Sequence, residues 1–124
     1  MRIVRLSESA AERIGVRPFA VSNASSLELA EGEGEAHAYV IYLQPGGEIG
    51  PHEAGFGQLF LALAGEGWVA GQDGVRQTLA TGEAAFFACG ELHSKGSETG
   101  LTALMVQVRE LTPLYDARKG SVSR

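Results

Sequence analysis

The chain has 124 residues, which is room for one domain with one hydrophobic core, and we expect a single domain over residues 1–124. Its 15 acidic and 10 basic residues give a net charge of −5, which disfavours a nucleic-acid partner. No apolar run approaches the roughly 20 residues of a membrane span, and the N-terminal residues lack the apolar core of a secretory signal. The single cysteine excludes an intrachain disulfide, which is compatible with a reducing compartment. Together these features lead us to expect a cytoplasmic protein without a membrane partner.

The N-terminal third predicts little regular structure. Ser7–Gly15 favours one or two helical turns, because a serine can cap the helix and a glycine ends it. Leu27–Glu35 carries four glutamates and two glycines, a pattern typical of a solvated turn or sheet edge.

From residue 37 onward, short apolar runs separated by turn residues predict β structure. The expected strands are His37–Gln44, Gln58–Ala64, Trp68–Ala70, Val75–Leu79, Ala84–Ala88 and Leu101–Arg109. The chain has 17 glycines, which fall at irregular short intervals and suit tight turns. This spacing is typical of a sandwich or barrel, and the polar tail from Thr112 is expected to fray.

The pair Asp73-Gly74 lies between two predicted strands and is a hairpin signal. The preceding stretch, residues 65–70, fits a relaxed dinucleotide-binding fingerprint. That motif needs a helix after it, because the phosphate rests on the helix N-terminus. Since a hairpin is predicted there instead, we expect no nucleotide cofactor.

Two histidines, His52 and His93, each lie in a glycine-framed turn next to a predicted strand. Residue type alone favours a structural role for each of them. The spacing of the glycines around each histidine says more about its role. The first reads GGEIGPHEAGFGQ over residues 46–58 and is closed by Gly65, and the second reads GEAAFFACGELH over residues 82–93, followed by SKGS.

These segments resemble the two sequence motifs of the cupin superfamily, G(X)5HXH(X)3-4E(X)6G and G(X)5PXG(X)2H(X)3N. The positions in register are Gly46, His52, Gly65, Gly82, Gly90 and His93. The resemblance covers about residues 37–108. It implies an all-β fold, an antiparallel double-stranded β-helix (jelly-roll) barrel with a short N-terminal extension, whose two histidines point into the barrel mouth.

Several motif positions are changed, and this bears on function. Ala54 replaces the second histidine of the motif and Gln58 replaces its glutamate. Carried over residue by residue, the resemblance implies a metal set of His52, Gln58 and His93. Two imidazoles and an amide oxygen could hold Zn, Ni or Fe, but without a carboxylate the charge of the ion is not offset and its affinity falls.

Two other residues are possible additional ligands. Glu91 shares the face of His93 if that segment is extended, although a solvent-exposed turn residue is the more ordinary interpretation. His37 could supply a third imidazole if its face of the strand lines the barrel, or it could lie at an edge. Cys89 lies among apolar neighbours and is expected to be buried rather than to act as a ligand.

The lining of the pocket follows from strand alternation. If Gln58 points inward, Phe60 and Ala62 point inward with it, and the small-residue stretch of Gly55 and Gly57 beside Ala54 could leave extra room at the mouth. An apolar mouth with a few convergent polar groups would suit a small organic ligand.

Three functions are compatible with these features. The first is a divalent-metal-dependent enzyme of dioxygenase, isomerase, lyase or cyclase type acting on a small organic molecule, with no catalytic residue assigned. The second is a non-catalytic cupin that binds or senses a small molecule with weak or no metal. The third is a domain kept for self-association. The resemblance also implies a homodimer, and Arg2–Arg5 and Arg17–Ser22 are the expected contact segments.

Overall fold

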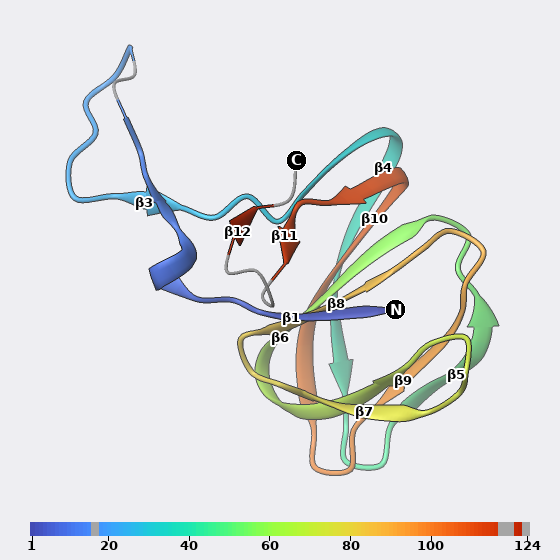
Figure 1. Cartoon of the computed structure of the whole chain (residues 1–124). Coiled ribbons are helices and arrows are strands. Elements are labelled where there is room, and N and C mark those ends of the chain that lie inside the picture. Colours follow the sequence, from blue (N-terminus) through green and yellow to red (C-terminus); the bar gives the residue numbers. More distant parts are fainter. Residues whose placement is uncertain (16–17, 117–120, 123–124) are drawn as a thin grey trace.

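The computed structural model describes residues 1–15, 18–116 and 121–122. Almost all of the regular structure in these ranges is β (Figure 1). The strands are β1 (Arg2–Arg5), β2 (Glu12–Arg13), β3 (Ser25–Ser26), β4 (Ala30–Leu43), β5 (Glu48–Glu53), β6 (Gly57–Ala70), β7 (Arg76–Ala80), β8 (Glu83–Phe87), β9 (Leu92–Gly96), β10 (Leu101–Pro113), β11 (Tyr115–Asp116) and β12 (Ser121–Val122). Within the described ranges, no helix has the length and apolar character needed to cross a membrane.

Two antiparallel sheets enclose the core and share the long strand β6. The first half of β6 pairs with β8 and β10, giving a first sheet in the order β1-β8-β6-β10-β4. The second half of β6 pairs with β7 and β9, and β9 pairs with β5, giving a second sheet. Figure 1 shows the strands of the two sheets curving around one another, with β1 running across the barrel in this view. The predicted all-β jelly-roll barrel is confirmed.

Alternation along β6 decides which side chains fill the barrel. Phe60 and Ala62 point inward and are fully buried, whereas Leu59 packs on the opposite face of the first sheet. The buried side chains inside the barrel are Leu43, Phe60, Ala62, Val69, Leu79, Ala85, Phe87, Leu101, Ala103 and Met105. Outside the first sheet a second cluster contains Val4, Leu59, Ala84, Phe86 and Tyr115.

The edge strand β4 is longer than the sequence predicted. It begins at Ala30 instead of His37, so the glutamate-rich stretch is the solvated edge of the first sheet rather than a turn. Gly32 explains part of this extension, because a Cβ there would lie 2.5 Å from the carbonyl oxygen of Glu110 on β10. The glycine therefore lets the two backbones approach closely.

The Asp73-Gly74 hairpin is confirmed. β6 and β7 pair in register from Ala70 opposite Arg76, and Gly74 has a φ of +72° in the turn between them. An Asp73 carboxylate oxygen accepts a hydrogen bond of 2.9 Å from the backbone N–H of Val75, which stabilises the turn.

The structure bears out one expectation at the chain ends only in part and contradicts the other. The segment predicted as one or two helical turns contains one short 3-10 turn, Glu8–Ala10 (η1), followed by β2, which pairs with β3. The C-terminal tail does not fray from Thr112, because β10 continues to Pro113 and the apolar Leu114 and Tyr115 are buried. Apolar side chains in a mostly polar tail are enough to dock it.

The segment Arg2–Arg5, expected to contact a second subunit, forms β1 and pairs with β8 of the same chain. Arg17, at the start of the other expected contact segment, lies outside the described residues.

Candidate functional site

The two motif histidines lie directly opposite one another on neighbouring strands. His52 on β5 pairs with His93 on β9, so both occupy strands and not the turns expected from their glycine frames. Their Nε2 atoms are 3.2 Å apart. His52 is exposed, whereas His93 is 1% exposed. Burial lowers the pKa of His93 to about 4, with the nearby charge of Lys95 adding to the effect, so its imidazole is neutral at pH 7.

Gln58 is also buried in the barrel, and its partner is a lysine. Its Oε1 accepts a hydrogen bond of 2.5 Å from the ammonium of Lys95. Lys95 follows His93 by two residues on β9, so the two side chains share one face of that strand. The ammonium lies 4.8 Å from the ring centroid of Phe60 and 5.1 Å from that of Phe87.

Lys95 is 1% exposed, a rare environment for a lysine. Burial lowers the pKa of Lys95 to about 8, so its amine is still protonated in most molecules at pH 7. Across the described residues, no carboxylate forms an ion pair with it. The barrel therefore contains a buried positive charge balanced by one amide oxygen and two aromatic rings.

Sequence reasoning missed Lys95 as a site residue. The signal was present, because a residue two positions from an inward-facing histidine points inward on a strand. Placing His93 in a turn hid this relationship.

The two possible additional ligands are held elsewhere. The carboxylate of Glu91 accepts hydrogen bonds from the N-terminal ammonium at 2.5 Å and from the backbone N–H of Ala88 at 3.0 Å. His37 is exposed, contacts Glu35 at 2.6 Å and stacks on Phe56 with ring centroids 6.0 Å apart. The structure therefore brings His52 and His93 together, with Gln58 in the same barrel, but not Glu91 or His37.

Two further sequence expectations concern the loops beside the histidines. Cys89 is exposed and not buried, because it lies in the turn before β9, where its thiol donates to the carbonyl of Gly55 at 3.3 Å. Ala54 is buried, and its backbone exchanges hydrogen bonds with Gly90 and Glu91. These hydrogen bonds hold the two loops together at Ala54, whereas the neighbouring Gly55 has open space beside it and Gly57 is packed against Leu111.

The donor set does not fit a resident divalent ion. Among the described residues, no three His, Cys, Asp or Glu side chains converge as a metal site. The amide oxygen of Gln58 is taken by an ammonium, whose charge would repel a cation. The buried Nδ1 of His93 has no hydrogen-bond partner in the described structure, whereas a metal-binding imidazole almost always donates its other N–H to an acceptor.

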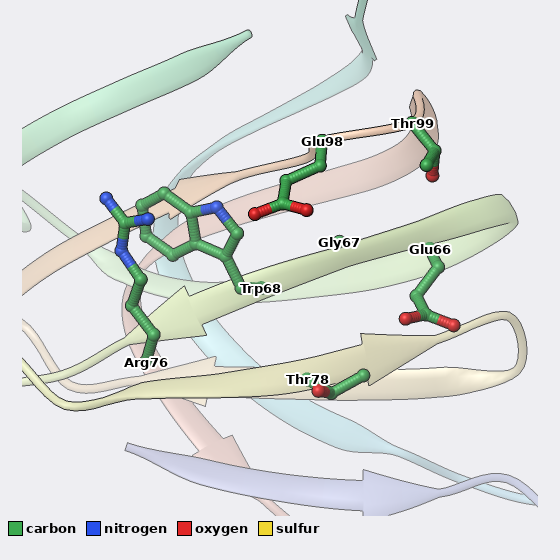
Figure 2. Close-up of a pocket in the computed structure, with 7 residues that line it drawn as sticks. All are labelled: Glu66, Gly67, Trp68, Arg76, Thr78, Glu98 and Thr99. Atoms are coloured by element: carbon green, nitrogen blue, oxygen red, sulfur yellow. The ribbon is translucent and has the colours of Figure 1, made fainter. Parts of the chain in front are cut away.

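A hollow lies on the outer face of the second sheet and has a volume of about 320 Å³. Figure 2 shows the guanidinium of Arg76 lying on the indole of Trp68, with the carboxylate of Glu98 beside the indole and that of Glu66 at the other end of the hollow. The guanidinium carbon of Arg76 is 3.7 Å from the centroid of the indole. Trp68 covers Gly96, where a Cβ would lie 2.5 Å from the indole. This hollow is therefore separated from the barrel interior by the sheet itself.

Comparisons with known proteins address the fold. No family model matches the chain, and no curated protein matches it. Its structure is similar to that of an RmlC-like cupin from Shewanella frigidimarina, with a TM-score of 0.57 and 24% identity over 60% of this chain and 67% of the other. The chain has the cupin fold. The resemblance drawn from the glycine and histidine positions is thus confirmed at the level of the fold.

Other cupin-like structures similar to this one carry enzyme names. One is called a predicted oxalate decarboxylase, from Thermotoga maritima, with a TM-score of 0.54 and 28% identity over 58% of this chain and 64% of the other. Another is the DMSP lyase DddQ from Ruegeria pomeroyi, with a TM-score of 0.55 and 23% identity over 59% of this chain and 38% of the lyase. The cupin fold thus occurs with different reactions, and the reaction cannot be read from the fold.

Proposed function

We propose that this cupin binds a small organic molecule inside its barrel without a resident divalent ion. The observation that carries the proposal is the buried hydrogen bond between the ammonium of Lys95 and the amide oxygen of Gln58. A buried charge of this kind is often less stabilising than a well-packed apolar side chain of similar volume. Departures from apolar packing of this kind are expected at functional sites.

The surroundings of the pair support the same function. Gln58 on β6 and His93 and Lys95 on β9 converge beside the rings of Phe60 and Phe87. A few convergent polar groups in an apolar lining are characteristic of small-molecule sites.

One observation favours the alternative, a divalent-metal-dependent enzyme. The Nε2 atoms of His52 and His93 approach to 3.2 Å, as two imidazoles turned toward a common point would. For Gln58 to become the third ligand, the ammonium of Lys95 would have to leave its oxygen. Zn, Ni and Fe remain the ions to search for in this alternative.

Elemental analysis of protein purified without a histidine tag separates the two functions. We expect much less than one ion per chain, unchanged in His52→Ala and His93→Ala. The matched control is His37→Ala, an exposed histidine on β4. One ion per chain in the parent and in His37→Ala, lost in both motif variants, would contradict metal-free binding and support the enzyme.

The homodimer implied by the cupin resemblance remains a proposal, supported by an apolar surface outside the first sheet. Tyr42 on β4 is 69% exposed, and Val40 and Leu63 are also exposed. Light scattering should give a dimer mass that Tyr42→Glu lowers to that of a monomer, whereas Val75→Glu, a change to an exposed apolar residue near the β6–β7 turn, leaves the mass unchanged. A monomer mass for the parent at micromolar concentration would contradict the dimer. The cytoplasmic location also remains a prediction.

A further inference from the structure

The ammonium of Lys95 has hydrogen-bonding capacity that the described residues do not use. It carries three N–H donors, and Gln58 accepts from it at one oxygen. The rings of Phe60 and Phe87 contribute cation–π attraction but no acceptor atom. Because a buried charge is costly without a counter-charge, a ligand that supplies a negative group would complete this site.

The hydrogen bonds of the two histidines determine the missing partner of His93. His52 Nδ1 lies 2.9 Å from the carbonyl oxygen of Gly50, so it must donate, and the Nε2 of a neutral His52 therefore carries a lone pair. His93 Nε2, 3.2 Å away, is then the donor of the histidine pair. The remaining nitrogen, His93 Nδ1, is a buried lone-pair acceptor with no donor in the described structure.

The two unfilled groups lie close together. His93 and Lys95 are two residues apart on one face of β9, a spacing of about 7 Å along a strand. Both also contact Phe87, since the imidazole of His93 meets that ring edge-on at 4.6 Å between centroids. The ammonium of Lys95 requires a negatively charged acceptor, and His93 Nδ1 requires a donor such as a hydroxyl group.

The geometry points to a small hydroxycarboxylate as the ligand of the barrel, with its carboxylate on the ammonium of Lys95 and its hydroxyl donating to His93 Nδ1. This inference rests on the proposed metal-free binding function and specifies the chemical class of its ligand. The aliphatic part of such an acid would lie against the ring of Phe87.

The exposed His52 marks the side of the barrel from which a ligand would approach His93. A Cβ built at Gly50 or at Gly55 meets no other atom within 4 Å, so there is open space on either side of this histidine. A small anion entering there would reach His93, which lies opposite His52, before it reaches Lys95.

Three probes of nearly equal size separate the contributions of charge and hydroxyl. Glycolate carries both groups, acetate lacks the hydroxyl, and glycolamide lacks the charge. Each is titrated at pH 7 and constant ionic strength into ¹⁵N-labelled protein, up to about 50 mM because affinities for such small solutes are in the millimolar range. The resonances followed are the backbone amides of β9 and the side-chain amide of Gln58.

We expect glycolate to bind more tightly than acetate by about threefold to tenfold, the range for one neutral hydrogen bond. The affinity of glycolate should exceed that of glycolamide by more than about tenfold, since the hydrogen bond from the ammonium of Lys95 to a carboxylate is charge-assisted. Lys95→Met should remove the preference for glycolate over glycolamide, and His93→Phe the preference for glycolate over acetate. Arg76→Gln, a change to an exposed cation on the outer face, should leave all three affinities unchanged.

Several results would overturn the inference. If glycolamide binds as tightly as glycolate, the ligand is not an anion, although metal-free binding of a small molecule stands. If acetate matches glycolate, the role given to His93 is wrong. If none of the probes shifts these resonances in the parent protein, the inference fails without any variant, and the elemental analysis decides separately on the proposed function.

Discussion

Two cations lie on aromatic rings on opposite faces of the second sheet, and their surroundings differ in one decisive way. Outside, Arg76 stacks on Trp68 (Figure 2) and is largely exposed. The carboxylate of Glu48 lies 3.6 Å from its guanidinium. Inside, Lys95 lies over Phe60 and is buried, and Gln58 is its hydrogen-bond acceptor. The outer cation has water and a counter-charge, whereas the inner one has neither within the described structure.

This difference shows why the inner cation is the better indicator of function. An exposed ion pair contributes between about 0 and 1 kcal/mol, because solvent screens it, so its presence requires no explanation beyond the surface. A buried charge costs several kcal/mol unless it is compensated. The inner cation therefore makes the fold less stable than an apolar core would, and the proposed binding function would account for its presence.

The largest effect is expected from removing the acceptor of the inner cation. Gln58→Leu leaves the ammonium of Lys95 buried without a hydrogen bond, and we expect the free energy of unfolding to fall by about 3 kcal/mol. Urea denaturation at pH 7 measures this change. Gln58→Leu/Lys95→Met should recover most of the loss, since neither polar group remains. Additive losses in the double variant would show that the pair is not coupled.

A smaller effect is expected on acidification, through His93. Its pKa is about 4 in the folded state and near 6.5 in the unfolded chain. Between these values the unfolded state binds the additional proton, so stability falls as the pH drops from 6.5 to 4, by about 2 kcal/mol. Urea denaturation at several pH values should show this slope in the parent and in His37→Gln, which changes an exposed histidine. His93→Phe should flatten it, and an equal slope in His93→Phe would assign the acid sensitivity to other groups.

Lys95 should produce a comparable or smaller effect on the alkaline side. The folded protein releases the Lys95 proton near pH 8, whereas the unfolded chain holds it to about 10.5. The unfolded state therefore binds more protons in this window, and stability rises with pH, by about 1–2 kcal/mol from pH 8 to 10. The measurement is the difference between the parent and Lys95→Met, in which the rise should be absent. A parallel pH dependence of the two proteins would mean that burial does not lower the pKa of Lys95 in the folded state.

The sequence predicted the backbone turns and strand faces around the site better than the contacts between its side chains. Gly46, Gly65 and Gly82 have positive φ values, so the glycine spacing that indicated the fold reflects backbone conformations that other residues rarely adopt. Strand alternation likewise placed Phe60 and Ala62 inside with Gln58.

The contacts of the site could not be predicted in the same way. They depend on pairing between β5 and β9, whose residues are about forty positions apart, with a register shift between Ile49 and His52. Only that register places His93 opposite His52. Similarly, the partner of Glu91 is at the far end of the chain, at Met1, and no local pattern links the two. Long-range register decides these contacts, and it leaves no short-range signal in one sequence.

The smallest effect is expected from the outer cation. Arg76→Gln removes a stacked guanidinium and an ion pair with Glu48, both exposed, so the free energy of unfolding should change by less than about 0.5 kcal/mol. Trp68 is the single tryptophan of the chain, so its fluorescence reports the loss of the stacked cation while urea denaturation reports the unchanged stability. The same emission should be insensitive to Lys95→Met, because the sheet lies between the two cations. A loss of more than about 1 kcal/mol in Arg76→Gln would mean that the outer cation stabilises the barrel, and the contrast between the two faces would then no longer identify a binding site.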